Sequence, residues 1–560
     1  MKEAEAPPPT DENRRPETRD PPQTARDALA EGLATRIGRW AGEMGAAQAD
    51  IAPLMRAARE LALAACDGHV CLPLAALSGP QAQDTRRALL AAGLAVEAGA
   101  RELSAKAWPL VIDGERLYLR HYFELETHLA TALATLAAAA PPAAAAPSPA
   151  RLRAVLDARF PPRPAKDADW QKVAAALALT RRLTIVSGGP GTGKTTTVAA
   201  LIACLLECEP DLRIALAAPT GKAAARLREA LAARARELPE AVRAKLPAQA
   251  HTIHRLLGAT PTQGRFRHHA ANPLALDLLV VDEASMLDIA LAVALLDALP
   301  AHARLVLLGD KDQLAAVEAG AVFADLSAGW LFGAAQAARI AALTDVPAQA
   351  LRHGSNQTRA ALPDCVVWLR ESHRFRADSG IGRLARDINA GEGAAALGWL
   401  RAGDGGDAVI WIEEDDDART NASTAARGPS AAALAAMENG YAAYIDALRA
   451  KPEGEPPSAR AARVFAAFER FRVLVAVHDS PHGRAEIDAH LAAHIRAALG
   501  VDLAAGPFWA GRPLIMLKND PVTRLFNGDI GLCLPDAEGA ARVYFPTADG
   551  SYRALPPQRL

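Results

Sequence analysis

A glycine-rich segment in the first half of the chain has the residue types that hold nucleotide phosphates. The segment GGPGTGKTTT fits the pattern GxxxxGK[ST], and it follows an apolar run and precedes a helical segment, as that pattern requires. Its glycines let backbone N–H groups curl around phosphates, Lys194 adds a positive charge, and the Thr195 hydroxyl is a ligand for Mg²⁺. An ordinary glycine turn would leave Lys194 unexplained. The predicted ATP-binding residues are Gly188, Gly189, Pro190, Gly191, Thr192, Gly193, Lys194, Thr195 and Thr196.

Two carboxylates end the apolar run LDLLVVDEAS further along the chain. Asp282 is predicted to hold Mg²⁺ through water, and Glu283 to orient and activate the water that attacks the γ-phosphate. An acidic strand end by itself is more often a solvated turn. Downstream of a phosphate-binding loop, the catalytic interpretation is favoured.

Three further residues suit contacts to the bound nucleotide. Gln313, after the run RLVLLGD, is predicted to sense the γ-phosphate and report its loss. Arg374, in ESHRF, precedes a glycine-containing helix start, from which a second domain would offer it to the γ-phosphate. Gln171 has the amide needed to recognise an adenine edge. Each residue also has an alternative interpretation. Gln313 could belong to an ordinary turn, Arg374 could be a surface arginine, and Gln171 could be a solvated helix residue.

Two other strand ends suggest a path for single-stranded DNA. APTGKAAARL contains Thr220 and Lys222, and HTIHRLLG contains Thr252 and His254. Small residues with Thr, Lys or His at the start of a helix suit contacts to phosphodiesters. Either segment alone is more simply a helix cap. Together at one sheet edge they are better explained as a DNA track.

A parallel sheet is the element that would bring these residues together. The strand-like runs LTIVSG, RIALAAPT, LDLLVVDEAS and ARLVLLGD alternate with helical segments. That alternation predicts an α/β fold with helices on both faces of a parallel sheet and ligands at the carboxyl ends of the strands. The chemistry is therefore expected at one edge of this sheet.

The remaining segments predict further domains. The module at 26–136 is expected to be mostly helical, with two strands around Asp113-Gly114 and with GHVCLPLAAL as a connector. The predicted parts are a disordered tail at 1–25, this N-terminal module at 26–136, a Pro/Ala linker at 137–150, a first motor domain at 151–365, a second α/β region at 366–500 with a solvated acidic insertion at 413–430, and a small β unit at 501–560 with a turn at Asn527-Gly528.

Composition excludes several classes of protein. A length of 560 residues gives room for three or four domains of roughly 100–200 residues each. The net charge of −2 excludes a uniformly basic nucleic-acid coat, so a DNA contact has to be a local groove. The six cysteines form no paired CxxC motifs, which indicates reduced thiols in a cytoplasmic protein. No uninterrupted apolar run reaches the ~20 residues of a membrane helix, so no membrane contact is expected.

The ordered motifs resemble the superfamily 1 DNA helicases, and most closely the RecD family, the alpha subunits of exodeoxyribonuclease V. GHVCLPL in the N-terminal module and FWAGRPLIMLKND and RLFNGDIGL near the end also match, so the resemblance runs from about residue 60 to the end. It implies RecA-like motor domains and an ATP- and Mg²⁺-dependent 5′→3′ translocase. It also implies RecB-like and RecC-like partner subunits, contacted by the N-terminal module, in double-strand break repair by homologous recombination.

The resemblance also assigns roles residue by residue. It gives ATP–Mg²⁺ contacts to Lys194 and Thr195, Mg²⁺ to Asp282 and water activation to Glu283. The other assignments are γ-phosphate sensing for Gln313 and Arg374, adenine for Gln171, and the DNA track for Thr220, Lys222, Thr252 and His254.

One departure from the family pattern lies after LPPQRL. Family members continue into a VHKSQGSE-like segment and an arginine-bearing TRAR-like segment, and the printed sequence contains neither. The second RecA-like domain and the charge around the transferred phosphate are therefore expected to be incomplete. Three hypotheses stay open: a helicase subunit, an assembly subunit that binds ATP with little hydrolysis, and a stand-alone superfamily 1 helicase.

Overall fold

The protein is described by a computed structural model, which divides into two compact units. The described residues are 25–77, 81–100, 108–140, 147–161, 168–259, 265–314, 319–352, 360–376, 378–413, 428–478, 480–502, 506–517, 520, 522–523, 525, 528–547 and 550–560. The first unit comprises Met1–Gly189, Cys204–Ala215 and His254–Leu369, and the second comprises Pro190–Ala203, Leu216–Ile253 and Arg370–Leu560. Residues 1–24 of the predicted tail, 141–146 of the predicted linker, 414–427 of the predicted insertion and Asn527 of the predicted turn lie outside the described residues.

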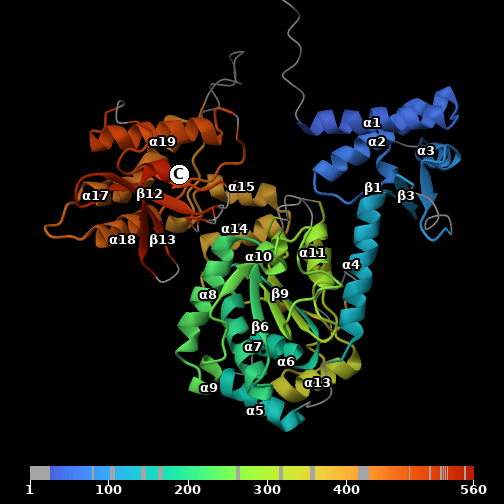
Figure 1. The fold of residues 1–560 in the computed structure, drawn as a ribbon, viewed down its shortest axis with the longest axis horizontal. Helices are drawn as coiled ribbons and strands as arrows, with labels where there is room; N and C mark the ends of the chain where they lie inside the picture. Colours follow the sequence, from blue (N-terminus) through green and yellow to red (C-terminus); the bar gives the residue numbers. More distant parts are fainter. Residues whose placement is uncertain are drawn as a thin grey trace, which may run out of the picture. The chain divides into compact units, whose positions relative to one another are not determined.

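The N-terminal module, in the first unit, combines helices with a small sheet (Figure 1). Its elements are α1 (Ala25–Glu43), α2 (Gln48–Cys66), β1 (Cys71–Pro73), α3 (Gln81–Ala91), β2 (Ala95–Glu97), β3 (Leu110–Asp113), β4 (Arg116–Leu119) and α4 (Arg120–Ala138). The predicted strands around Asp113-Gly114 are confirmed, since β3 and β4 pair antiparallel and Gly114 has φ +54°. The expected connector GHVCLPLAAL is wrong in part, because its Cys71–Pro73 pairs with β4 in the sheet order β1-β4-β3-β2.

The connector became a strand because its apolar side chains belong to the core of this module. Leu72 and Leu74 are buried together with Leu54, Leu89 and Leu117. Pairing with β4 satisfies the backbone groups of this short segment while it buries those side chains. A three-residue strand has too little alternation to be recognised from sequence alone.

The motor sheet of the first unit is parallel, as predicted. It consists of β10 (Val366–Leu369), β5 (Leu183–Gly188), β9 (Arg304–Gly309) and β8 (Leu278–Val281), paired in that order. Its helices are α5 (Pro149–Arg159), α6 (Trp170–Thr180), α10 (Ile253–Leu257), α11 (Ile289–Asp297), α12 (Val322–Ser327) and α13 (Ala334–Thr344). Every residue of β5, β8 and β9 is buried, which explains their continuous apolar character.

One predicted boundary falls before a strand of this sheet. The second α/β region was expected from residue 366, yet β10 pairs in parallel register with β5, with Val366 opposite Ile185. The sheet of the first unit therefore extends to Leu369. The mostly buried VVWL run of β10 lies at the edge of the sheet, where it pairs with a strand about 180 residues earlier in the chain.

Several helices of both units begin where a side chain caps the first turn. The capping residues are Ser148 before α5, Asp169 before α6, Thr220 before α8 (Gly221–Ala235), Asp288 before α11 and Ser379 before α14 (Gly380–Asn389). Each side-chain oxygen accepts a hydrogen bond from a backbone N–H that the helix itself leaves without a partner. These caps set the helix starts that the alanine-rich sequence leaves poorly marked.

The second unit contains a parallel strand pair, helices and an antiparallel sheet. Its elements are α7 (Lys194–Cys208, which continues into the first unit), β6 (Ile214–Ala218), α8, α9 (Glu240–Arg243), β7 (Ala250–Thr252), α14, α15 (Gly393–Arg401), α16 (Ala431–Gly440), α17 (Ala442–Arg449), α18 (Pro457–Phe468), α19 (Arg484–Leu499), β11 (Pro513–Ile515), β12 (Ile530–Pro535), β13 (Ala541–Pro546) and β14 (Tyr552–Leu555). β6 pairs in parallel with β7, and β11 to β14 form an antiparallel meander that confirms the predicted small β unit.

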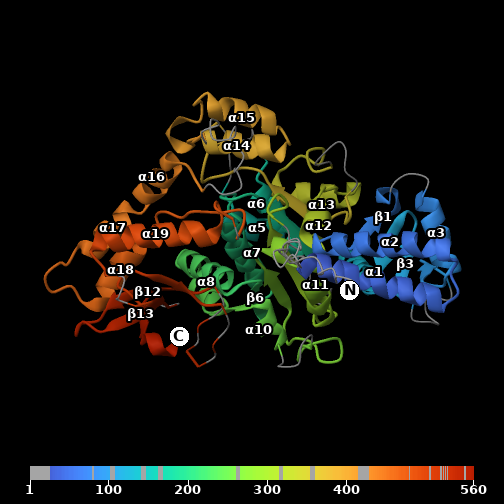
Figure 2. The same ribbon diagram turned by 90° about the horizontal axis from the view of Figure 1, so that it is seen from above.

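Helices cover one side of this meander (Figure 2). Tyr444 of α17 and Phe465 of α18 are buried with Leu532 and Tyr544 of the sheet, and the Tyr444 hydroxyl donates to the carbonyl oxygen of Gly511 at 2.7 Å. Among the described residues from Arg370 to Arg512 the regular elements are all helical, so this part differs from the α/β pattern that was expected. The apolar run around Leu474, which is 93% exposed, has no ladder partner within these described residues.

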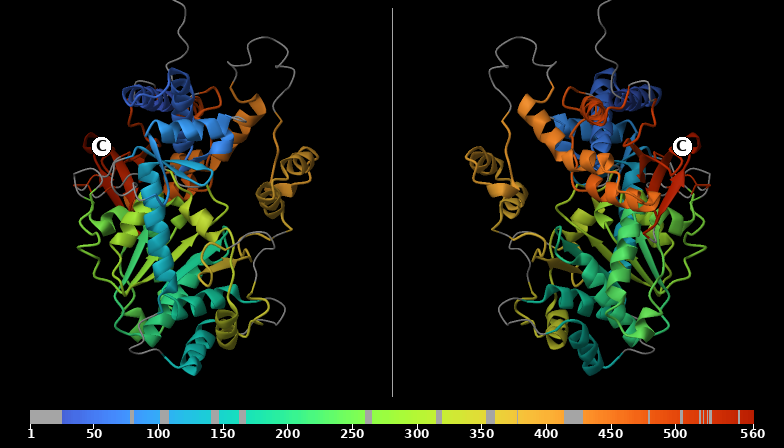
Figure 3. Two further views of the ribbon diagram at one scale, coloured as in Figure 1. Left: turned by 90° about the vertical axis from the view of Figure 1, so that its right-hand side faces the viewer. Right: turned by 90° about the vertical axis from the view of Figure 1, so that its left-hand side faces the viewer.

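The helix α4 connects the N-terminal module to the motor sheet. It contacts α11 and β5, and Figure 3 shows this long helix beside the sheet of the first unit. His128 Nε2 of α4 lies 2.9 Å from an Asp297 carboxylate oxygen at the end of α11, and Gly320 N–H donates to the Gly68 carbonyl oxygen at 2.9 Å. No helix in the described ranges is long and apolar enough to cross a membrane.

A half-buried carboxyl group on α4 makes the stability of this module pH-dependent. Glu126 Oε2 has no hydrogen-bond partner among the described residues, while Oε1 lies 3.5 Å from the Tyr118 hydroxyl. Burial raises the pKa of Glu126, Arg116 and Tyr118 oppose that rise, and Asp325 and Asp113 add to it. Because the folded state holds this proton more tightly, the free energy of unfolding falls as pH rises from the ordinary pKa to the raised one, and it stays lower at neutral pH.

We therefore expect Glu126→Gln to raise the free energy of unfolding at pH 7.5 by about 1 kcal/mol and to change it little at pH 4. Thermal unfolding at both pH values measures the effect. Glu124→Gln, on an exposed position of the same helix, is the control, since its ion pair with Arg120 contributes little to stability. An equal effect of Glu126→Gln at both pH values would contradict the burial explanation.

Candidate nucleotide-binding site

The phosphate loop lies between a buried strand and a long helix, as predicted. Gly188 ends β5, and α7 begins at Lys194 and runs for 15 residues. Gly191 and Gly193 have φ of +78° and +81°, a left-handed conformation that strongly favours glycine. Thr197 closes the turn, because its backbone N–H donates to the Gly193 carbonyl oxygen at 2.8 Å. A glycine-rich turn that leads into a helix N-terminus is an arrangement that suits phosphate binding.

A second segment of the second unit holds this loop. The Ser372 hydroxyl donates to the Pro190 carbonyl oxygen at 3.1 Å, and His373 N–H donates to the Gly191 carbonyl oxygen at 2.8 Å. A side chain at Gly191 would place its Cβ only 2.4 Å from Arg374 Cβ. Arg374, predicted as a γ-phosphate contact, therefore stands directly against the phosphate loop. Sequence patterns did not identify Ser372 and His373; their only signal was their place beside Arg374 in ESHRF.

The predicted acidic pair follows β8 in a tight turn. Glu283 has φ +52°, and its backbone N–H donates to Asp282 Oδ1 at 2.9 Å. A left-handed glutamate costs about 1–3 kcal/mol, and such strain is concentrated at functional sites. Both residues are half-buried, which leaves their carboxylates accessible at the end of the strand. The geometry suits carboxylates that act on a bound group.

The carboxyl ends of β5, β9 and β8 meet at one edge of the first unit's sheet. Lys311 N–H, after β9, donates to the Ser187 hydroxyl of β5 at 3.2 Å. A Cβ at Gly189 would lie 4.0 Å from an Asp310 carboxylate oxygen. The structure thus brings together the start of the phosphate loop, the loop after β9 and, through the β8–β9 pairing, the acidic pair.

The sensor glutamine contacts the turn that carries the acidic pair. The Ser285 hydroxyl donates to Gln313 Oε1 at 3.3 Å, and Ser285 is buried although Gln313 is exposed. Ser285 follows Glu283 by two residues, so this hydrogen bond connects Gln313 to the turn that carries the acidic pair. Sequence patterns did not single out Ser285, and a hydroxyl inside an otherwise apolar buried turn was the available signal.

Gln171 lies on the helix that leads into β5. It occupies the first turn of α6, where its backbone N–H donates to Asp169 Oδ1 at 3.1 Å, and α6 contacts both β5 and β10. Its side chain is half-buried. The adenine contact assigned to this side chain stays a prediction.

The predicted DNA residues of the second unit sit at the carboxyl ends of a parallel pair. Thr220 follows β6 and Thr252 ends β7, so the pairing places both at the same edge. The Thr220 hydroxyl accepts from Ala223 N–H at 3.2 Å, so this side chain is a helix cap, the plain alternative considered above. Lys222 is exposed in the first turn of α8. A DNA contact for these residues stays a prediction.

His254 belongs to a basic and aromatic patch of the first unit that the motif search missed. Its ring lies 5.8 Å from the ring of Phe266, which stands between Arg265 and Arg267. His268 and His269 follow directly, and no acidic residue interrupts the segment. Basic residues interleaved with an aromatic ring suit stacking and phosphate contacts to single-stranded nucleic acid. The sequence RFRHH at 265–269 was the available indication of this patch.

Comparison with known proteins gives consistent matches. A family model described as an AAA domain matches residues 171–319. The RecBCD enzyme subunit RecD of Mycolicibacterium smegmatis is 36% identical over 444 residues, covering 78% of this chain and 67% of the relative. The ATP-dependent RecD2 DNA helicase of Deinococcus radiodurans is 32% identical over 485 residues, covering 84% of this chain and 53% of the relative. A solved Pif1 helicase structure aligns with 70% of this chain and 76% of its own, with a TM-score of 0.31 and 15% identity. The chain thus spans about two thirds or less of these curated relatives.

Proposed function

Because this chain belongs to the RecD family of RecBCD enzyme subunits, we propose that it is an ATP-driven DNA helicase subunit that translocates 5′→3′ on single-stranded DNA. The observation that carries the proposal is the contact of Ser372, His373 and Arg374 with the phosphate loop. A loop that only turned the chain would need neither a lysine at the start of α7 nor an arginine held against its glycines. Both charges suit phosphoryl transfer.

Each site residue has a proposed task in hydrolysis. Bound ATP would supply the phosphoanhydride bond, and Mg²⁺, for which Thr195 and Asp282 are the proposed ligands, would neutralise charge on the phosphate oxygens. The amides of Gly189 to Thr196 and the Lys194 ammonium bind the phosphates. Glu283 orients the attacking water and accepts its proton, while Arg374 stabilises charge that develops on the γ-phosphoryl group.

Gln313 is the proposed link between hydrolysis and movement. Its hydrogen bond to Ser285 joins the loop after β9 to the turn after β8. Loss of the γ-phosphate would remove a partner of Gln313 and bias these two turns toward a second arrangement. The residues proposed to contact DNA are Thr220, Lys222, Thr252 and His254, and the patch at Arg265–His269 is proposed in addition.

The partners and the two other hypotheses belong to the same proposal. RecB-like and RecC-like subunits are the expected partners, with the N-terminal module as the docking part, and repair of double-strand breaks in the cytoplasm is the expected setting. The alternatives remain an ATP-binding assembly subunit with little hydrolysis and a stand-alone helicase. The match to a RecD2 helicase favours keeping the latter.

Two assays on the full chain test this proposal. ATP hydrolysis is measured with and without oligo(dT), and translocation direction is measured as displacement of streptavidin from oligonucleotides biotinylated at either end. We expect DNA-stimulated hydrolysis and displacement from the 3′ end, which a 5′→3′ motor reaches. Tight ATP binding without DNA-stimulated turnover, even with co-expressed RecB-like and RecC-like subunits, would favour the assembly subunit. Activity as a monomer that does not bind those subunits would favour the stand-alone helicase.

A further inference from the structure

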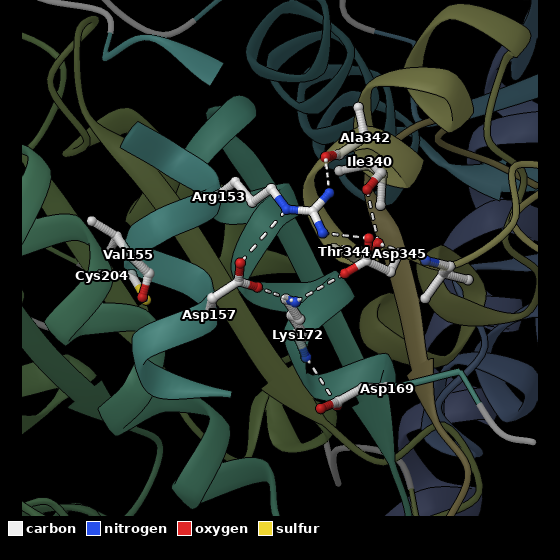
Figure 4. Close-up of polar contacts among 11 residues, drawn as sticks. Arg153, Val155, Asp157, Asp169, Lys172, Cys204, Ile340, Ala342, Thr344 and Asp345 are labelled. Carbon is white, nitrogen blue, oxygen red and sulfur yellow. Dashed lines mark hydrogen bonds and ion pairs between the residues drawn. The ribbon is translucent and has the colours of Figure 1, made fainter. Parts of the chain in front are cut away.

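A lysine is buried beside the glutamine assigned to adenine. Lys172 lies in the first turn of α6 and is 6% exposed. Its ammonium donates to Asp157 Oδ1 of α5 at 2.6 Å and lies 3.9 Å from Asp345 Oδ2 at the end of α13 (Figure 4). Lysines are almost never this buried unless they are paired. The ion pairing therefore explains how the buried charge of Lys172 is tolerated. The position of Lys172 beside Gln171 suggests a role beyond stability.

Four charged groups from three helices form one network around this lysine. Arg153 of α5 donates to Asp345, and its Nε lies 3.6 Å from Asp157 Oδ2. Its other terminal nitrogen donates to the Ala342 carbonyl oxygen in the last turn of α13, at 3.2 Å. Asp345 caps α13 in the left-handed conformation, with φ +63°. Two cations and two carboxylates thus balance in the contact among α5, α6 and α13.

The same turn of α6 is held by two further contacts. Asp169 Oδ1 accepts from the backbone N–H groups of Gln171 and Lys172, each at 3.1 Å. The Trp170 ring packs edge-on against the Trp330 ring, with centroids 5.1 Å apart. At the far end of α6, Gln336 of α13 donates to the Thr180 hydroxyl at 3.2 Å. Helix α6 is therefore pinned against α13 at both ends, and its first turn is fixed on both sides of Gln171.

Stability alone is a weak reason for such a network. Removing charges from water costs free energy that ion pairing often only offsets, and well-packed apolar residues frequently do as well. A network of fixed charges does hold a helix in one rotational setting about its axis. Neighbouring side chains of a helix project in directions about 100° apart, so the directions of adjacent residues are then set together. Locking Lys172 and Trp170 sets the direction in which Gln171 leaves the helix. Recognition of a base edge by an amide needs such a fixed direction.

We propose that Lys172, through its contacts with Asp157 and Asp345, is a positioning residue that fixes the first turn of α6 and thereby makes the site selective for adenine over guanine nucleotides. This inference rests on the proposed ATP-binding function. It concerns selectivity for the base, which the phosphate loop and the acidic pair do not determine.

The test measures nucleotide binding, so it does not depend on hydrolysis. Dissociation constants of the full chain for ATP and GTP are obtained by competition against a fluorescent mant-nucleotide, with the wild type compared to Gln171→Ala, Lys172→Met and Asp345→Asn. We expect Lys172→Met and Gln171→Ala each to reduce the preference for ATP by about tenfold or more, the worth of a good amide–adenine pair. GTP affinity should change little, because the phosphate contacts remain.

Arg304→Met is the matched control. Arg304 is also buried and ion-paired, with its guanidinium 2.6 Å from Glu209, but its partner directly follows α7 and belongs to neither α5 nor α13. Its loss should lower stability without changing the ATP-to-GTP ratio. If Lys172→Met fails to fold, Asp345→Asn makes the same test, because Asp345 is 62% exposed at its side chain and its substitution leaves the core packing in place.

The outcomes separate this inference from the proposed function. An unchanged ATP-to-GTP ratio in folded Lys172→Met, or in Asp345→Asn where Lys172→Met does not fold, would overturn the positioning role. An unchanged ratio in Gln171→Ala would also overturn it, because nothing would remain to position, yet DNA-stimulated hydrolysis would stand. Absence of nucleotide binding in the wild type would instead reject the proposed function itself.

Discussion

Replacing Lys194 by alanine is expected to lower DNA-stimulated ATP hydrolysis by at least about 10³-fold. Lys194 begins α7 directly after the left-handed Gly193, so its side chain extends from the loop that is proposed to hold the phosphates. Removal of this charge takes away stabilisation that increases as the γ-phosphoryl group separates. Steady-state hydrolysis with saturating oligo(dT) measures the effect.

Lys451→Ala is the control for this substitution, because Lys451 is an exposed lysine after α17 and outside every predicted motif. The control should keep wild-type hydrolysis. Strong DNA-stimulated hydrolysis by Lys194→Ala would remove the phosphate loop from the catalytic site and with it the motor assignment.

Arg374→Ala is expected to lower kcat by about 10³–10⁵-fold while nucleotide binding changes only a few-fold, as for arginines that stabilise phosphoryl transfer. Its backbone stands against Gly191, and Ser372 and His373 anchor the same segment to the loop. We expect an arginine in that place to act mainly on charge that develops during the reaction. Single-turnover hydrolysis and mant-ATP titration together separate the rate effect from the binding effect.

A neighbouring arginine offers a matched control. Arg376 is two residues away, 85% exposed and paired with Asp378 at 2.8 Å. Arg376→Ala should leave both kcat and nucleotide affinity unchanged. If Arg374→Ala and Arg376→Ala had the same small effect, Arg374 would be a surface arginine, the plain alternative considered from the sequence.

Lys194→Ala and Arg374→Ala are complementary, because neither variant alone separates an effect on the structure of the phosphate loop from an effect on catalysis. Lys194→Ala removes a charge from within the loop, whereas Arg374→Ala removes one from a segment that is distant in sequence. Retained binding with lost turnover in the second case would show that the ESHRF segment contributes to catalysis as well as to loop structure.

Local patterns were enough to predict the phosphate loop, the acidic pair and the strands β5, β8 and β9 of the motor sheet. The glycine-rich turn before Lys194 could be recognised because Gly191 and Gly193 adopt positive φ, which glycine tolerates far better than other residues. Buried parallel strands are continuous apolar runs, so β5, β8 and β9 could be recognised without their partners. The signal for each of these elements lies in its own residue types, even where the partner strand is distant in the chain.

Contacts between distant segments were decided only by the tertiary structure. Pairing of β10 with β5, of β1 with β4 and of His373 with Gly191 depends on backbone hydrogen bonds, and any residue type except proline can donate such bonds, so no sequence pattern marks them. The helical character of the segment from Arg370 to Arg512 was missed for a related reason, since alanine-rich sequence has weak periodicity.

The environment of Lys172 shows the same division. Its place next to Gln171 is visible in the sequence, yet its burial is not, because the carboxylates that make burial tolerable come from α5 and from the end of α13. The sequence by itself determined the chemistry that each loop offers, through residue type and local backbone preference. The tertiary structure alone decided which side chains are desolvated, paired and held in a fixed direction, because desolvation and pairing depend on neighbours that are far apart along the chain.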